Sequence, residues 1–352
     1  MTARLGRHPR GVSRPLGSHW ARFDCKDCTG SCCSTVLTIS RPEEVENDYE
    51  HFALECLGGL PGGSVRYVHC RRCDLIYMDP ALNPDGQAAF FDAMYRRGVG
   101  SVAAPNLVRV EQRRLKRIAR FLRPPGRLLD IGCGTGTFAA VAAENGWEAW
   151  GHEISPAGYA AAQTRLHDRV LTGPLSALPS GWADCVTLFS VVEHTTDPVA
   201  VLQDAARICR PGGLVVFNVP NAGSLEARVS MALRATWLGF NLSHVWSWTD
   251  RSVRALAAQA AIVPCAVESR LPLFSLRSER GCENLNGPMP SGAHPPVRRL
   301  RRFVDPAFWW RLRILLNAPF DGSVLGERVR LGSYLFVYAR REQLPPRNPT
   351  HP

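Results

Sequence analysis

The stretch Leu128-Leu129-Asp130-Ile131-Gly132-Cys133-Gly134-Thr135-Gly136 decides the fold class of this chain. An apolar run carries one acidic residue, and three glycines follow at every second position. An Ala-rich stretch of helical character then runs from Thr137 to Asn145. Because glycine lacks a Cβ, the backbone can turn sharply there and approach a ligand closely. The pattern therefore predicts a strand, a ligand-binding turn and a helix.

Composition and charge set the class of protein. The chain has 352 residues, of which 45% are hydrophobic and 21% charged, so most of it can form a packed core. Its net charge of +11 permits contact with anionic surfaces, but no RNA- or DNA-binding signature accompanies the charge, so nucleic acid is not favoured as a partner. Neither a secretory signal nor a run of ~20 apolar residues is visible, which predicts a cytoplasmic protein. In that compartment the 12 cysteines are metal ligands or buried small hydrophobes rather than disulfides.

Strand and helix patterns alternate from residue 127 onward. We expect strands at 127–131, 147–152, 169–171, 184–190, 213–219, 264–270 and 332–339. Helices are expected between them at 137–145, 156–166, 198–209 and 250–261, and an earlier one at 107–122. Repeated alternation of this kind predicts an α/β fold with a parallel sheet covered on both faces.

The glycine run and its acidic residue distinguish between two classes of nucleotide ligand. A dinucleotide-binding turn has the spacing Gly-x-Gly-x-x-Gly, whereas the third glycine here comes one residue early. Asp130 stands two residues before the first glycine, and a carboxylate about 6 Å from a phosphate costs roughly 3 kcal/mol at an effective dielectric constant near 20. A ligand with a cationic end gains instead. S-adenosylmethionine carries such an end, and its ribose hydroxyls suit Glu153, which follows the second expected strand.

At this point the run 128–136 resembles motif I of the class I S-adenosylmethionine-dependent methyltransferases. Residues 181–194, which end in Glu193-His194, are similar to that family's fourth strand and its Glu-His ending. Residues 210–217 (Arg-Pro-Gly-Gly-Leu-Val-Val-Phe) are similar to its turn into the fifth strand. The resemblance implies a doubly wound, Rossmann-like, mostly parallel seven-stranded sheet whose last strand is antiparallel.

The resemblance also implies a set of residues that hold S-adenosylmethionine. The glycines line the methionine part, an acid takes the ribose, an apolar side chain packs on the adenine, and a serine flanks the sulfonium. In this chain the set is Asp130, Gly132, Cys133, Gly134, Gly136, Glu153, Ile154 and Ser190.

The acceptor side offers Glu193, His194 and His244 as candidate catalytic residues. Methyl transfer needs a base only where the acceptor loses a proton. In related enzymes a Glu-His pair acts as a base or as part of a metal site; the alternative is that His194 caps a helix or bonds to backbone. Trp246 and Trp248 flank the same loop and either wall the acceptor or belong to the core.

Two cysteine pairs, Cys25-x-x-Cys28 and Cys70-x-x-Cys73, have the spacing of a structural zinc site. The second pair resembles the second knuckle of zinc ribbons that precede many small-molecule methyltransferases. The first pair departs from that pattern, because 41 residues (29–69) separate the pairs and Cys32-Cys33 offers competing thiols. The stretch 90–95 resembles the helix that places a tyrosine over the cofactor in those enzymes, although Tyr95 could equally serve helix packing.

These patterns predict a domain order. It comprises a disordered basic tail (1–18), a zinc-ribbon-like module (19–80), a helical linker or cap (81–122), a methyltransferase domain (123–341) with an insertion at 271–331, and a second disordered tail (342–352). The insertion carries a basic, aromatic stretch at 297–316 that forms a lid or packed helices, or contacts a membrane surface.

The expected activity is methyl transfer from S-adenosylmethionine to a small-molecule acceptor, a biosynthetic intermediate of the sugar, lipid or natural-product type. The alternative is an RNA- or protein-modifying methyltransferase that grips its substrate with the basic insertion and the ribbon. No Asn/Asp-Pro-Pro-Tyr signature of base-modifying enzymes follows the fourth strand, which disfavours that alternative.

Overall fold

The computed structural model describes residues 14–16, 19–22, 33–39, 54–55, 57–60, 63–96, 105–233, 237, 239–270 and 333–341. The predicted ligands Cys25 and Cys28, the insertion at 271–331 with its basic stretch 297–316, and the C-terminal tail lie outside these residues. Among the helices of the described residues, none is both long enough and apolar enough to cross a lipid bilayer.

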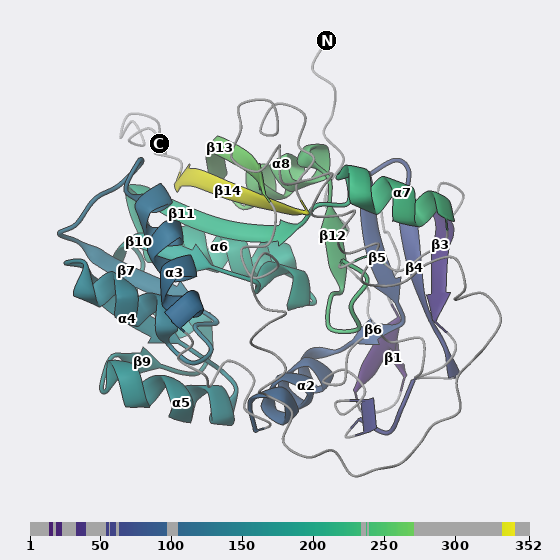
Figure 1. The fold of residues 1–352 in the computed structure, drawn as a ribbon, viewed down its shortest axis with the longest axis horizontal. Helices are drawn as coiled ribbons and strands as arrows, with labels where there is room; N and C mark the ends of the chain where they lie inside the picture. Colours follow the sequence, from purple (N-terminus) through teal and green to yellow (C-terminus); the bar gives the residue numbers. More distant parts are fainter. Residues whose placement is uncertain are drawn as a thin grey trace, which may run out of the picture.

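A seven-stranded sheet organises the larger half of the molecule (Figure 1). Its strands are β7 (Arg127–Ile131), β8 (Glu148–His152), β9 (Val170–Leu171), β10 (Ala183–Leu188), β11 (Cys209–Pro220), β13 (Ile262–Arg270) and β14 (Tyr334–Arg341). Their order is β13-β14-β11-β10-β7-β8-β9. The five strands β7 to β11 pair in parallel, whereas β14 runs antiparallel to both of its neighbours. The predicted sheet, including the antiparallel last strand, is confirmed.

Helices cover both faces of this sheet. Successive residues of a strand point to opposite sides, so each strand contributes side chains to two apolar clusters. Leu128 and Cys185 face one apolar cluster, while their neighbours Leu129 and Val186 face the other. The first cluster includes side chains from α3 (Pro105–Ile118), α4 (Thr137–Glu144) and α5 (Pro156–Leu166). The second includes side chains from α6 (Pro198–Ile208) and α8 (Asp250–Gln259). The sheet is thus buried on both faces, as its near-continuous apolar strands require.

Two smaller sheets form the other half of the molecule. A four-stranded antiparallel sheet has the order β12-β5-β4-β3, and a three-stranded sheet has the order β1-β2-β6. Their strands are β1 (Arg14–Leu16), β2 (Trp20–Arg22), β3 (Cys33–Ile39), β4 (Val65–Cys70), β5 (Leu75–Asp79), β6 (Ala81–Leu82) and β12 (Trp246–Trp248). The strand β1 lies within the segment 1–18 that the sequence assigned to a tail.

The strand β12 joins the two halves of the molecule. It comes from the loop after β11 but pairs with β5 of the N-terminal sheet, with Trp246 opposite Tyr77 and Trp248 opposite Leu75. Both tryptophans are 1% exposed or less. Of the two roles that the sequence left open for them, the structure therefore supports the core.

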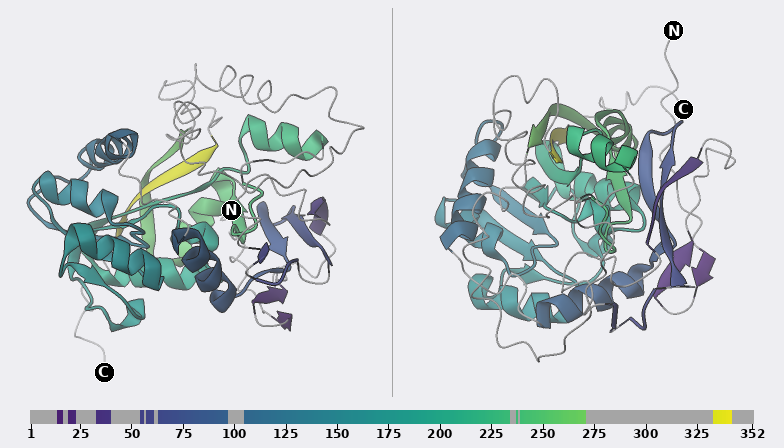
Figure 2. Two further views of the ribbon diagram at one scale, coloured as in Figure 1. Left: turned by 60° about the horizontal axis from the view of Figure 1, so that its bottom comes forward. Right: turned by 45° about the vertical axis from the view of Figure 1, so that its right-hand side comes forward.

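Two helices complete the described fold. The helix α2 (Pro84–Arg96) contacts β6 on one side and α5 on the other, so it spans the two halves (Figures 1 and 2). The helix α7 (Leu225–Leu233) follows β11 and was not predicted, and neither was β12. The predicted strands and helices of residues 127–270 lie within a few residues of the observed ones.

Thr249 ties the start of α8 to the N-terminal module. Its hydroxyl accepts from the Ser252 backbone N–H at 3.3 Å, which caps the helix, and lies 2.8 Å from the Asp74 carboxylate. Asp74 also lies 3.3 Å from the His69 ring, and these hydrogen bonds, that of His69 first, hold the pKa of Asp74 below its ordinary value. One hydroxyl thus serves a helix cap and a contact between the two halves.

We expect Thr249→Ala to lower the free energy of unfolding by about 1–2 kcal/mol, because both the cap and the contact with Asp74 are lost. Thr249→Ser keeps the hydroxyl and should retain most of the stability. Urea denaturation of the two variants measures the difference. Equal losses in both variants would show that the methyl group, not the hydroxyl, matters.

Candidate cofactor and acceptor site

The glycine turn after β7 is held in a conformation that requires glycine. Gly132 and Gly134 have φ values of 65° and 55°, in the left-handed region. A Cβ on Gly132 would lie 2.5 Å from the Val191 side chain, and one on Gly134 would lie 2.8 Å from the Tyr95 hydroxyl. The turn therefore has room only for backbone, as the sequence predicted.

Asp130 lies at the carboxyl end of β7 and is 4% exposed. Its carboxylate accepts a hydrogen bond of 2.6 Å from the Thr187 hydroxyl on the neighbouring strand β10. Burial raises the pKa of Asp130 to about 7, and the Thr187 hydrogen bond opposes that rise. A cation placed next to this carboxylate would relieve the cost of burying it.

Glu153 organises the turn from the end of the adjacent strand β8. Its carboxylate accepts backbone N–H bonds from Gly134, Ile154 and Ser155, each 2.9 Å long. Burial raises the pKa of Glu153, while these backbone hydrogen bonds lower it. Asp130 and Glu153 thus lie at the same edge of the sheet, on either side of the glycine turn, as the sequence predicted.

Three further residues of the predicted cofactor set differ in their surroundings. Ile154 is 63% exposed, an unusual exposure for a large apolar side chain beside a buried acid. Ser190 is exposed at the end of β10 with a φ of 55°, and its backbone N–H is held by the Asn218 side chain at 3.0 Å. The Cys133 thiol packs toward Gly151 within the core and lies 3.9 Å from the Gly134 carbonyl oxygen.

The helix α2 brings two aromatic side chains from the N-terminal half to this edge. Tyr95 places its hydroxyl over Gly134, and its ring also approaches Gly158. Burial raises the pKa of Tyr95 well above its ordinary value, with the nearby Glu153 carboxylate acting in the same direction. Phe91 makes an edge-on contact with the His194 ring, with centroids 4.9 Å apart. The helix therefore covers both the glycine turn and the Glu-His pair.

Sequence reasoning missed an ion pair on α3. Glu111 is buried, and burial raises its pKa, although the Arg114 guanidinium 3.0 Å away opposes the rise. Arg114 also lies over the Phe189 ring at the end of β10, 4.6 Å from its centroid. A signal existed: both residues fall on the face that carries Leu115 and Ile118, next to the apolar stripe.

Glu193, His194 and His244 converge, although the last comes from a different loop. Their potential ligand atoms all lie within 4.8 Å of one another, and the two imidazole centroids are 4.8 Å apart. The first two belong to the 3-10 helix η4 (Val192–His194) after β10. The Val245 backbone N–H donates to the Glu193 carbonyl at 2.8 Å, which holds the His244 loop beside η4.

Burial disfavours charge on each member of this cluster. It raises the pKa of Glu193 to about 8 and lowers the pKa of His194 to about 4. It also lowers the pKa of His244 well below its ordinary value, and the neighbouring His194 adds to that effect. Both imidazoles are therefore neutral near pH 7.

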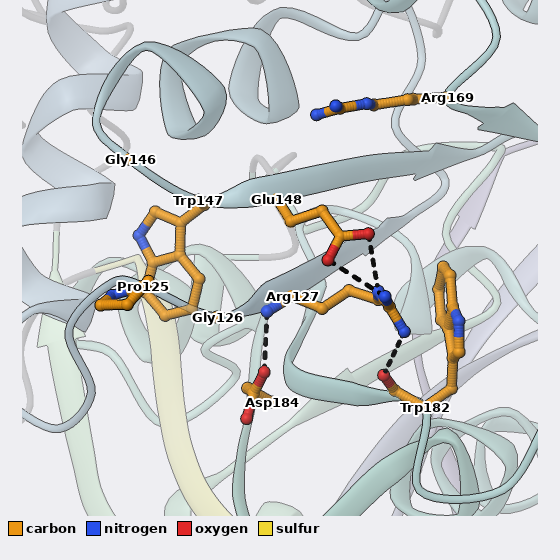
Figure 3. A pocket seen from close by; sticks show the side chains of 9 residues that line it. All are labelled: Pro125, Gly126, Arg127, Gly146, Trp147, Glu148, Arg169, Trp182 and Asp184. Carbon is orange, nitrogen blue, oxygen red and sulfur yellow. Dashed lines mark hydrogen bonds and ion pairs between the residues drawn. The ribbon is translucent and has the colours of Figure 1, made fainter.

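A cavity of about 600 Å³ lies at the opposite edge of the sheet, where β7, β8 and β10 begin. Figure 3 shows Arg127 there, between the Glu148 carboxylate and the Trp182 ring. The Arg127 guanidinium is 3.0 Å from that carboxylate and 4.8 Å from the ring centroid. Ligands of open parallel sheets bind at the carboxyl ends of the strands, so these paired charges support the sheet rather than the cofactor site.

The described cysteines of the N-terminal half gather at one end of the β3–β4 pair. Cys33 lies opposite Cys70 in the strand register, and the Cys73 backbone N–H donates to the Cys70 Sγ at 3.4 Å. The Tyr77 hydroxyl lies 3.8 Å from the Cys33 Sγ. Of the predicted ligands, the structure places Cys70 and Cys73 in one turn and adds Cys33 beside them.

Comparison with known proteins finds similarity for the larger half. Residues 106–261 match the family model described as a methyltransferase domain. This part of the chain is therefore similar to methyltransferase domains. The match begins on α3, covers the strands β7 to β11 and ends after α8, so it includes the glycine turn, Asp130 and Glu153.

Curated relatives match this chain over about a hundred residues. The ubiquinone biosynthesis O-methyltransferase of Alkalilimnicola ehrlichii is 32% identical over 105 residues, which are 27% of this chain and 42% of that protein. The malonyl-[acyl-carrier protein] O-methyltransferase of Serratia marcescens is 34% identical over 106 residues, 29% of this chain and 42% of that protein. The chain spans less than half the length of these curated relatives.

Among solved structures, a SAM-dependent methyltransferase from Thermotoga maritima aligns with 72% of this chain and all of its own. The TM-score is 0.45 and the sequence identity 19%.

We expect Asp130→Asn to change how stability depends on pH when no ligand is bound. A carboxyl whose pKa is raised by folding costs stability progressively as the pH rises from its ordinary value toward about 7, and the cost stays constant above that. The variant avoids this cost, so its melting temperature should rise relative to wild type between about pH 5 and pH 8.

Asp184→Asn is the matched control for this prediction. Partial burial would raise the pKa of Asp184, but its hydrogen bonds to Arg210 and the Arg127 backbone hold it below its ordinary value. The stability that ionised Asp184 contributes is therefore present above the pKa of the unfolded state. It is lost only as the pH falls through the lower pKa of the folded state. Asp184→Asn should accordingly destabilise the protein at both pH 5 and pH 8. A pH-independent difference for Asp130→Asn would contradict the raised pKa.

Proposed function

We propose that this protein transfers a methyl group from S-adenosylmethionine to a small-molecule acceptor, a biosynthetic intermediate of the sugar, lipid or natural-product type. The observation that carries the proposal is the pair of buried carboxylates, Asp130 and Glu153, around a backbone-only turn in a methyltransferase domain. The relatives named as ubiquinone and malonyl-carrier O-methyltransferases support an acceptor of this kind.

The residues at this edge fit S-adenosylmethionine part by part. Asp130 would face the cationic amino-acid end, because its carboxylate is buried and its hydrogen bond from β10 comes from the neutral Thr187 hydroxyl. A carboxylate has about four acceptor sites, and Glu153 uses three for backbone, which leaves capacity for a ribose hydroxyl. Ile154 offers exposed apolar surface to a flat base. Gly132, Cys133, Gly134 and Gly136 would contribute backbone, and Ser190 would flank the sulfonium side.

When bound, the cofactor would supply an activated methyl group, because its positively charged sulfonium becomes a neutral thioether once the methyl group has been transferred. The protein then needs mainly to orient two molecules and exclude water, and orientation alone can supply ~7–11 kcal/mol of the barrier. Tyr95 and Phe91 on α2 cover the turn and the His194 ring, so they are placed to exclude water from the transfer.

The acceptor side is assigned to Glu193, His194 and His244. These side chains lie after β10 and β11, next to the glycine turn, because Val191 of the same segment packs on Gly132. They would orient the acceptor or receive its proton. The macromolecular alternative rests on the insertion at 271–331, outside the described residues, and is not proposed.

We expect Glu153→Gln and Asp130→Asn each to weaken binding of S-adenosylmethionine by at least about ten-fold, or ~1.4 kcal/mol. Isothermal titration calorimetry measures the dissociation constants. Glu148→Gln is the matched control: it neutralises a carboxylate on the same strand β8, but at the far end, where Glu148 pairs with Arg127. The proposal fails if the folded wild type binds no S-adenosylmethionine.

For the N-terminal half we propose a structural zinc ion held by Cys70, Cys73 and thiols of the segment 25–33. The predicted set used Cys25 and Cys28, and the position of Cys33 opposite Cys70 makes it a further candidate. The backbone N–H of Cys73 already donates to the Cys70 sulfur, a contact that stabilises a thiolate ligand. A zinc ion here would stabilise the fold rather than take part in methyl transfer.

Cys73→Ser should lose one equivalent of zinc and melt at a lower temperature than wild type. The exposed Cys265→Ser is the control and should lose neither. Inductively coupled plasma mass spectrometry gives the zinc content. Equal zinc contents in the two variants would remove the site.

A further inference from the structure

The cluster Glu193, His194 and His244 carries an inference that does not depend on methyl transfer. Two imidazoles and one carboxylate, with all potential ligand atoms within 4.8 Å of one another, form the donor set of a divalent metal ion. The set is not a local sequence motif. The 3-10 helix η4 supplies Glu193 and His194, whereas His244 comes from a loop about 50 residues later. The two residues that flank His244 hold this loop in place: the Ser243 carbonyl contacts the His194 ring, and the Val245 N–H donates to the Glu193 carbonyl.

Backbone carbonyls fix the orientation and the tautomer of both imidazoles. The His194 Nδ1 lies 2.9 Å from the Ser243 carbonyl oxygen, and the His244 Nδ1 lies 3.3 Å from that of Gly239. A carbonyl oxygen only accepts, so each Nδ1 donates its proton, and each Nε2 of a neutral ring keeps a free lone pair. Metal-ligating histidines are typically held in this way, by donating the other ring N–H to a backbone carbonyl.

The carboxylate of Glu193 supplies the second, independent observation. The residue is 0% exposed, and neither carboxylate oxygen has a hydrogen-bond partner among the described residues. Burying an ionised carboxylate without a hydrogen-bond partner is costly, and a bound cation would remove that cost. The two imidazoles beside it favour a cation, because one metal ion can bond to the carboxylate and to both rings at once, whereas one proton joins only two atoms.

The surroundings of the cluster are built to hold it in place. The Ser243 carbonyl that orients His194 also accepts from the Gln87 side chain at 3.0 Å, a bond that comes from α2. The Ser243 backbone and hydroxyl both donate to the Asn241 side chain, at 2.8 and 2.7 Å. Rigid support of this kind is what a preorganised metal site needs.

We propose that Glu193, His194 and His244 bind one divalent transition-metal ion, of which Zn²⁺ is the representative. Three protein ligands leave at least one coordination position open. His194 is only partly buried, so the ion can enter from the side of that ring. If the proposed function also holds, the open position would select acceptors that present an oxygen ligand.

The test uses the full chain, titrated with Co²⁺ after removal of metals by chelation. Cobalt bound to cysteines gives thiolate-to-metal charge-transfer absorption, whereas cobalt bound to imidazole and carboxylate gives only weak visible bands. We expect wild type to bind one Co²⁺ equivalent that adds no thiolate band. If every bound ion adds such a band, the proposal is wrong, whatever the variants show.

Variants then assign the ion to the cluster. Glu193→Gln and His244→Gln should each lose this one equivalent or bind it at least about ten-fold more weakly, with the thiolate bands unchanged. His167→Asn removes an exposed imidazole at the end of α5 and is the matched control. Binding of S-adenosylmethionine to the same samples is a separate readout of the cofactor site. Unchanged Co²⁺ stoichiometry and affinity in both variants would overturn the proposal.

Discussion

The pairing of β12 with β5 is the constraint on which the cluster Glu193, His194 and His244 depends. It draws the loop after β11 away from the seven-stranded sheet and into the sheet of the N-terminal half. Val245, just before β12, uses both backbone groups in this junction: its N–H donates to the Glu193 carbonyl, and its carbonyl accepts from the Met78 N–H at 2.9 Å. His244 is thereby fixed beside His194. The loop that carries His244 is thus held from two sides, by η4 through the Glu193 carbonyl and by the N-terminal sheet through Met78.

Three buried carboxylates give this edge of the sheet a common electrostatic character. Asp130, Glu153 and Glu193 are each 5% exposed or less, and burial raises the pKa of all three. A region with this many desolvated acids favours cationic ligands over phosphates. In the sequence, the acidic residue before the glycine run favoured S-adenosylmethionine over a dinucleotide, because a carboxylate repels phosphate. The same reasoning applies to the folded site, and it also supports the proposed metal ion at Glu193.

Much of the fold and of the cofactor edge could be predicted, because the information is local. The strand β7, the glycine turn and Glu153 lie within fewer than 30 residues of sequence, and the alternation of strand and helix patterns from β7 to β11 is unambiguous. The missed features depend on distant partners. β12 is three residues long and acquires its strand character only from β5. Glu111 and Arg114 look like solvated charges on a basic helix until the sheet covers them. The same holds for Cys33, which gains its significance from its position opposite Cys70.

The helix α2 brings side chains of the N-terminal half to the proposed cofactor and acceptor site. It begins in the N-terminal half, yet its side chains cover the glycine turn through Tyr95, the cluster through Phe91, and the support of His194 through Gln87. The half that matches the methyltransferase model carries the proposed donor edge, whereas α2 brings side chains of the N-terminal half to the space beside it. Because the curated relatives match only about a hundred residues of this chain, a proposed acceptor has to fit these added side chains as well.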